Sequence, residues 1–163
     1  MIDMSRLSRI LTPLVAATLL AAPTLSAQSA EQDVMAVVKR LFDGMRAGDS
    51  SMVRSVFHPQ VRMITASSRD GEVRTEIEMG VEDFAKAVGT PHPQKWDERI
   101  WNEKIHINGP LASVWTDYAF FRGDTFSHCG IDHFLLVKDT AGTWKVIELS
   151  DTRRKEGCQQ GGK

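Results

Sequence analysis

Residues 34–63 read "VMAVVKRLFDGMRAGDSSMVRSVFHPQVRM", and this stretch decides the fold. Its apolar side chains recur at steps of three and one, which predicts a helix with one apolar face; they are Val34, Val37, Val38, Leu41, Phe42 and Met45. Gly48 supplies a left-handed stop, Asp49 can cap a second, shorter helix, and we expect Pro59 to end that helix. The stretch therefore predicts two helices joined by a tight turn.

Downstream of this helix pair the pattern changes from helical to strand-like. Residues 61–67 and 72–78 predict a hairpin across Asp70 and Gly71, and residues 80–89 predict a short third helix. Four long segments rich in Trp, Val, Ile, Phe and Thr follow, with short turns between them: 96–107, 111–121, 125–137 and 143–153. Short connections favour an antiparallel, meandering sheet, so the sequence predicts an α+β fold.

Upstream of the helix pair, residues 1–27 have the features of a secretory signal peptide. Arg6 and Arg9 precede an apolar run at 10–22, and small residues precede a cut after Ala27. The run is shorter than the roughly 20 residues that a membrane-spanning helix needs, although a retained anchor helix is the alternative. We therefore expect a soluble periplasmic or secreted protein, with one domain at 28–156, a flexible tail at 157–163 and no membrane partner in the mature form.

The charged residues are nearly balanced, with 20 Lys and Arg against 21 Asp and Glu. They form no basic stripe or arm that could neutralise phosphates, so we expect no nucleic-acid partner.

Cys129 and Cys158 are the two cysteines of the chain. Export would place them in a compartment where disulfides persist, and we expect them to pair. The alternative is two free thiols, one in a strand and one on the tail.

The order of elements resembles the nuclear-transport-factor-2-like (NTF2-like) superfamily, also called the cystatin-like or SnoaL-like fold. The resemblance covers residues 31–154, and within the superfamily the chain is similar to a lumazine-binding-like or steroid-isomerase-like branch. It rests on the helix pair and on three later segments: "SVWTDYAFF" (113–121), "GIDHFLLV" (130–137) and "TWKVIELSDTRR" (143–154). The resemblance implies helices packed in the concave face of a strongly curved antiparallel sheet, a cone-shaped pocket, and a homodimer formed through the outer sheet face.

Within this resemblance, "GIDHF" (130–134) is similar to the segment that carries an oxyanion-hole aspartate in steroid isomerases, and Asp132 falls on that aspartate. Two other positions depart from the pattern. Leu41 stands in the place of a tyrosine, and the strand around Thr65 contains no carboxylate base. We therefore do not expect a steroid-isomerase mechanism.

The stretch "SHCGIDHF" (127–134) contains two histidines, a cysteine and an aspartate. Successive side chains of a strand point to opposite faces, so His128, Asp132 and Phe134 share one face while Cys129 and His133 share the other. The two histidines cannot ligate one metal from a regular strand, and we expect neither a metal site nor a cofactor.

We expect the face that carries Asp132 to line the pocket. By the strand pairing that the resemblance implies, the predicted ligand-binding residues are Trp115, Asp117, His128, Asp132, Phe134, Leu149, Asp151 and Arg153. A carboxyl group in an apolar cone has a raised pKa unless a cation or donors compensate. Asp132 and Asp117 are then either catalytic, with His128 assisting, or part of a structural network with Arg153 or His128.

Three functions remain open, because the fold alone does not choose among them. The first is an exported protein that binds a small, partly polar organic ligand. The second is an isomerase, dehydratase or hydrolase in which Asp132, Asp117 and His128 perform acid–base chemistry. The third is a dimerisation or interaction module whose pocket holds no ligand.

Overall fold

A computed structural model describes residues 24–69, 72–77 and 80–161. Within these residues helices come first and most strands follow, so the predicted α+β class is confirmed. The elements are α1 (Thr24–Ala47), α2 (Ser50–Val56), β1 (Phe57–Arg69), β2 (Glu72–Ile77), α3 (Val81–Gly89), β3 (Trp96–Asn108), β4 (Leu111–Arg122), β5 (Thr125–Lys138) and β6 (Trp144–Arg153).

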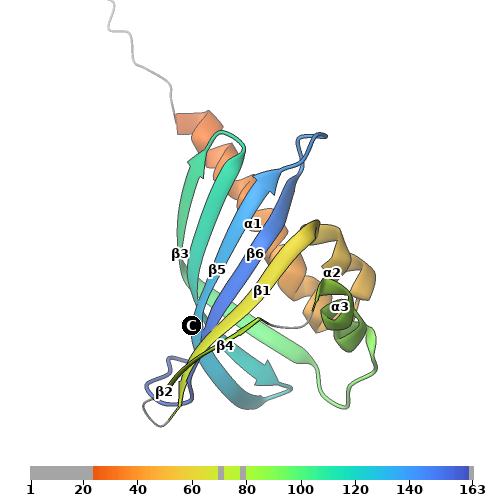
Figure 1. Cartoon of the computed structure of the whole chain (residues 1–163), viewed down its shortest axis with the longest axis vertical. Coiled ribbons are helices and arrows are strands. Elements are labelled where there is room, and N and C mark those ends of the chain that lie inside the picture. The colour runs from red at the N-terminus through yellow and green to blue at the C-terminus, as the bar shows by residue number, and fades with distance from the viewer. Residues whose placement is uncertain (1–23, 70–71, 78–79, 162–163) are drawn as a thin grey trace, which may run out of the picture.

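The strands form one open sheet in the order β2-β1-β6-β5-β4-β3. β1 runs parallel to β6, and all other neighbouring strands are antiparallel. The sheet curves strongly around α1, and α2 and α3 lie beside the C-terminal end of that helix (Figure 1). This is the cone that the sequence predicts.

The junction between α2 and β1 differs from the prediction. The Asp49 side chain does cap α2, because it accepts a hydrogen bond of 2.9 Å from the Met52 amide. α2 nevertheless ends at Val56, and β1 begins at Phe57, so Pro59 lies in a strand instead of ending a helix. The pairing of β1 with β6 shifts register between Phe57 and Arg62, and such an irregularity tolerates a proline that cannot donate to the ladder.

The apolar face of α1 forms one side of the core. Val34, Val38, Leu41 and Phe42 are all buried, and the Phe42 ring meets the Phe134 ring edge-on at 6.0 Å between centroids. Each fully buried side chain of this kind contributes roughly 1.5–3 kcal/mol relative to exposure. The core therefore fixes α1 against the middle strands of the sheet.

A disulfide joins Cys129 of β5 to Cys158, as expected from the sequence. Cys129 is buried on the outer face of the sheet, against Ala119 and Phe121. Its backbone also exchanges two hydrogen bonds, of 3.0 and 2.9 Å, with Arg154. The segment after β6 is thus tied to β5 twice.

The predicted signal peptide lies largely outside the described residues, and its last residues, 24–27, belong to the start of α1. None of the described helices is long and apolar enough to span a membrane.

Candidate functional site

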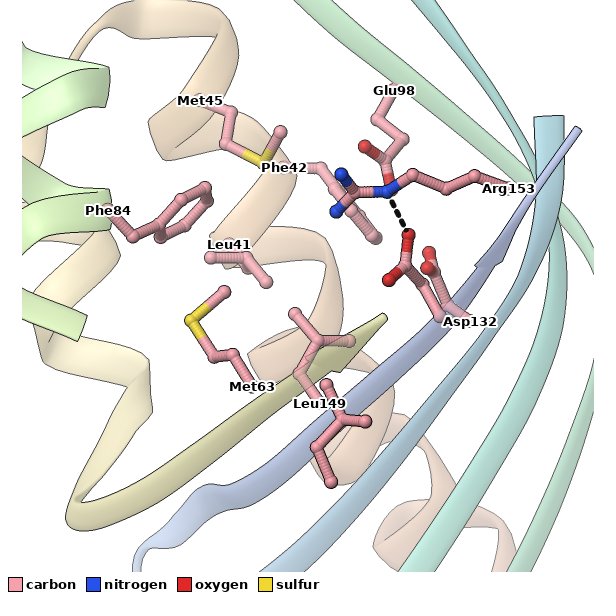
Figure 2. Close-up of a pocket in the computed structure, with 11 residues that line it drawn as sticks. Leu41, Phe42, Met45, Met63, Phe84, Glu98, Asp132, Leu149 and Arg153 are labelled. Atoms are coloured by element: carbon pink, nitrogen blue, oxygen red, sulfur yellow. Dashed lines mark hydrogen bonds and ion pairs between the residues drawn. The ribbon is translucent and has the colours of Figure 1, made fainter. Parts of the chain in front are cut away.

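A pocket opens between the concave face of the sheet, the C-terminal part of α1, and α3. It has an inner compartment of about 80 Å³ and an outer compartment of about 240 Å³. Both compartments are lined by Met45, Met63, Phe84, Glu98, Asp151 and Arg153. Figure 2 shows Glu98, Asp132 and Arg153 along one side, facing Met45, Met63 and Phe84 on the other. The pocket therefore has a polar side and an apolar side.

Asp132 lies on the polar side and is only 3% exposed. Strand pairing sets it between Thr116 of β4 and Asp151 of β6. Burial raises the pKa of Asp132 well above its usual range, and the neighbouring carboxyl group of Glu98 raises it further. Its Oδ2 atom is buried and has no hydrogen-bond partner among the described residues. The environment of Asp132 therefore favours the protonated carboxyl group, and its Oδ2 atom accepts no hydrogen bond from a donor of the described residues.

Glu98 of β3 is the partner of Asp132, and the sequence analysis did not select it. A hydrogen bond links the two carboxyl groups; it raises the pKa of Asp132 and lowers that of Glu98. Burial is the larger effect on Glu98 and raises its pKa to about 7. The sequence did contain a pattern that places Glu98 on the inner face. Glu98 lies two residues from both Trp96 and Ile100, so the three side chains share one face of the strand.

Asp151 of β6 is the centre of a second polar group. Its Oδ1 atom accepts a hydrogen bond from the Thr65 hydroxyl. Its Oδ2 atom accepts one of 2.6 Å from Arg153 Nε and lies 3.2 Å from the Tyr118 hydroxyl. Burial raises the pKa of Tyr118, so this hydroxyl keeps its proton. Donors from β1, β4 and β6 therefore hold the Asp151 carboxylate in place.

Gly130 makes this arrangement possible. The Tyr118 hydroxyl also lies 2.9 Å from the carbonyl oxygen of Thr152, which turns towards β5 opposite Gly130. A Cβ atom on Gly130 would lie 1.7 Å from that oxygen and 2.9 Å from Tyr118 Cε1. A residue without a side chain is therefore required at this point, and the close approach brings the end of β6 to the pocket.

His128 lines the outer compartment, as predicted, and is half-buried between the rings of Tyr118 and Phe120. Burial lowers its pKa to about 4, and the positive charge of Arg153 contributes. Its Nδ1 atom lies 3.0 Å from Ser127 Oγ. The imidazole is thus neutral at physiological pH.

Trp115 and Asp117 do not reach the pocket, and their predicted position is wrong. Trp115 is 49% exposed on the outer face, and Asp117 accepts a hydrogen bond of 2.8 Å from Asn102. The reason is a register shift in the β4–β5 hairpin, where Phe121 pairs with Phe126 but Phe120 pairs with His128. This bulge leaves Ser127 unpaired and turns Thr116, instead of Trp115 or Asp117, to the face of Asp132.

The other predicted residues divide between the pocket and the core. Leu149 lines the inner compartment, and Asp151 and Arg153 line both. Phe134 is fully buried in the core and lines neither compartment. The two positions that depart from the steroid-isomerase pattern both belong to the pocket region. Leu41 lines the inner compartment, and the Thr65 hydroxyl donates a hydrogen bond to Asp151.

Metal-ligating side chains do not converge in the part of the chain that the structure describes. No three His, Cys, Asp or Glu residues there could hold a metal ion together. The chemistry that these residues can supply is hydrogen bonding, charge and proton transfer.

Several solved structures have the same fold. A function-unknown protein of Mycobacterium tuberculosis is 12% identical with a TM-score of 0.65, and the match covers 82% of this chain and 76% of that chain. An NTF2-like protein with a cystatin-like fold from Novosphingobium aromaticivorans is 11% identical with a TM-score of 0.63, covering 86% and 94%. A "putative ketosteroid isomerase" from Shewanella frigidimarina is 16% identical with a TM-score of 0.54, covering 73% and 94%.

At these identities the likeness establishes the NTF2-like fold, which is the fold expected from the sequence. None of the curated proteins matches the chain. The model of the family described as "Putative lumazine-binding" matches residues 29–149, so the chain belongs to that family within the NTF2-like superfamily.

Proposed function

We propose that this chain is an exported domain that binds a small, partly polar organic ligand in the pocket beside Asp132. The observation that carries the proposal is Asp132, which lines the inner compartment and whose buried Oδ2 atom accepts no hydrogen bond from a donor of the described residues. Leaving such an atom unsatisfied costs about 1–3 kcal/mol, and natural proteins rarely retain that cost without a use. A ligand N–H or O–H group would supply the missing partner.

The size and lining of the pocket support a ring-shaped ligand. A dry cavity of about 150 Å³ is enough to hold benzene, and the outer compartment alone measures about 240 Å³. One side offers Met45, Met63 and Phe84, and the other offers carboxyl and guanidinium groups. The family description names lumazine, a flat bicyclic heterocycle with amide edges, and a molecule of that kind has both surfaces.

Export is supported by the sequence of residues 1–27 and by the disulfide. The apolar run behind Arg6 and Arg9 has the length and flanks of a signal peptide. The Cys129–Cys158 bond is of a type that persists in oxidising compartments. Expression of the full chain in a bacterial host should yield a periplasmic or secreted product whose first residue is near Gln28, and an uncut cytoplasmic product would contradict export.

Titration with lumazine tests ligand binding, with tryptophan fluorescence as the signal. We expect saturable binding that Asp132→Leu weakens at least about tenfold, the effect of losing roughly 1.4 kcal/mol. Asp117→Leu is the matched control, because Asp117 lies on the outer face and should leave the affinity unchanged.

Native mass spectrometry of the exported protein provides a second test that needs no chosen ligand. A retained small molecule that disappears in Asp132→Leu supports the proposal. An unliganded wild-type protein that also fails to bind lumazine and other flat heterocycles contradicts it.

Acid–base catalysis is the second candidate function, and the paired carboxyl groups favour it. Glu98, with a pKa of about 7, can accept a proton while the neutral Asp132 donates one, which is a pairing suited to isomerases and dehydratases. Glu98 takes the role that the sequence analysis gave to Asp117. If the chain is an enzyme, Glu98→Gln and Asp132→Asn should each lower turnover at least about 100-fold with unchanged melting temperature; full activity in both would exclude this candidate.

A further inference from the structure

The mouth of the outer compartment carries more positive charge than a neutral ligand needs. Arg122 at the end of β4 and Arg153 at the end of β6 both line it, together with the neutral His128. We propose that the ligand is an aromatic carboxylate whose ring lies in the outer compartment and whose carboxylate is bound by Arg122 and Arg153. This inference rests on the proposed function and adds the chemical class of the ligand.

Electrostatics at His128 show that cations converge here from separate elements. Besides burial, the positive charges of Arg153, Arg122 and Lys155 lower the pKa of the imidazole, and the negative charge of Asp151 raises it. These cations come from the ends of β4 and β6 and from the segment after β6. They are held near one another by tertiary structure, as expected for an anion site and not for scattered surface charges.

The carboxyl groups of the compartment leave Arg122 uncompensated. Asp151 is already occupied by donors from Thr65, Tyr118 and Arg153. Glu98 is hydrogen-bonded to Asp132, and its raised pKa leaves it largely uncharged below pH 7. Within the described residues no carboxylate forms an ion pair with Arg122.

The backbone that presents Arg122 is well ordered by its neighbours. Arg122 pairs with Thr125 across the hairpin and with Trp96 on β3. The next residue, Gly123, has φ of 60° and donates a hydrogen bond of 2.7 Å to the Lys95 carbonyl. The guanidinium group is therefore carried on a fixed strand end beside the pocket.

Aromatic rings beside the two arginines explain why the anion should be aromatic. Trp96 and Phe120 meet edge-on at 6.0 Å between ring centroids, and Phe84 also lines the compartment. His128 Nδ1 lies beside Ser127, so its Nε2 can hydrogen-bond to the ligand. A guanidinium group matches a carboxylate through two parallel hydrogen bonds, which makes a carboxylate the best fit to this mouth.

The test compares 2-naphthoate with its neutral counterpart 2-naphthamide by isothermal titration calorimetry at pH 6, where Glu98 is largely uncharged. The two probes share one ring system, but only naphthoate is charged and only naphthamide has N–H donors. If the two arginines bind the head group, we expect naphthoate to bind at least about tenfold more tightly, because its hydrogen bonds to them are charge-assisted. Arg122→Gln should weaken naphthoate binding about tenfold and change naphthamide binding less than about twofold. Arg122→Lys keeps the positive charge but cannot form the two parallel hydrogen bonds to a carboxylate. It should therefore weaken naphthoate binding less than Arg122→Gln does.

Arg74→Gln is the matched control, because Arg74 is exposed on β2 and lines neither compartment. It should leave the affinity for both probes unchanged, and melting temperatures will show that each variant is folded. Equal binding of the two probes, or naphthoate binding that Arg122→Gln leaves unchanged, overturns the anion site while the proposed pocket stands. Failure of both probes and of lumazine to bind the wild type contradicts the pocket itself.

Discussion

The carboxyl groups of Glu98 and Asp132 are hydrogen-bonded to each other although β3 and β5, which carry them, are not neighbours in the sheet. β4 runs between the two strands, where Phe120 pairs with Glu98 and Thr116 pairs with Asp132, so the two carboxyl groups meet across β4. The pair is thus a product of tertiary structure, and its protonation should be visible in the stability of the fold.

Stability should fall as the pH rises from about 4.5 to 7. An ordinary glutamate ionises near pH 4.5, but folded Glu98 keeps its proton until about pH 7. Between these values the folded state binds a proton that the unfolded state has released, so raising the pH favours unfolding. Asp132 acts in the same direction because its pKa is also raised.

We expect a loss of about 2–3 kcal/mol over this range, because one pKa unit corresponds to about 1.4 kcal/mol; urea denaturation at several pH values measures it. Glu98→Gln should reduce the dependence, because glutamine cannot titrate and only the contribution of Asp132 is left. A stability that rises across the same range would show that the pair is ionised in the folded protein.

Gly130→Ala should destabilise the protein by about 3 kcal/mol or more. The new methyl group would collide with the Thr152 carbonyl, a backbone atom that cannot move without breaking its bond to Tyr118. Gly80→Ala is the control, because Gly80 has φ of −62° and open space around it; it is the N-cap of α3, so the change should cost no more than about 1 kcal/mol. Equal denaturation midpoints for the two variants would contradict the close packing at Gly130.

Tyr118→Phe should cost about 1–3 kcal/mol, because it removes a buried donor from the Thr152 carbonyl and from Asp151. The effect should be smaller in a Thr65→Val background, since both hydroxyl groups serve the same carboxylate. A double-mutant cycle in urea measures this coupling, and strictly additive losses would show that the two donors act independently.

Replacing both cysteines, as Cys129→Ala with Cys158→Ala, should lower stability by about 3–4 kcal/mol in the chain-entropy model. The exported wild type should be about 2 Da lighter than its reduced form, because the bond removes two hydrogens. Two thiols that react with iodoacetamide under native, non-reducing conditions would contradict the bond.

Homodimer formation through the outer sheet face stays a prediction. Trp115 is 49% exposed there and its ring lies 5.7 Å from that of His133, which itself lies 2.9 Å from Ser113. If this face is the interface, sedimentation should find a dimer for the wild type and a monomer for Trp115→Asp. A monomeric wild type at all accessible concentrations would rule the interface out.

Much of the fold could be predicted, because hydrophobic periodicity reports which face of an element is buried. The apolar spacing from Val34 to Met45 identified α1, and the Trp-rich segments identified β3 to β6. The start of β1 could not be predicted, since Pro59 ordinarily argues against a strand and only pairing with β6 supports one there.

The site was predictable only where a strand stayed regular. Alternation placed His128, Asp132 and Asp151 correctly in relation to one another, because β5 and β6 pair without a shift between Asp132 and Leu135. It failed for β4, where a single unpaired residue reverses which side chains face inward. Glu98 was missed because its partner is set by the curvature of the whole sheet, which local patterns do not report.

The bulge at Ser127 makes hairpin length a determinant of the site. Loops usually accept insertions and deletions, because the strands on either side keep their packing. Here the removal of one residue between Arg122 and His128 would exchange the inner and outer faces of β4, burying Trp115 and Asp117 while expelling Thr116 and Tyr118. Point substitutions in this hairpin can alter the pocket by degrees, whereas a change of length by one residue would replace the part of the lining that β4 contributes, Tyr118, Phe120 and Arg122.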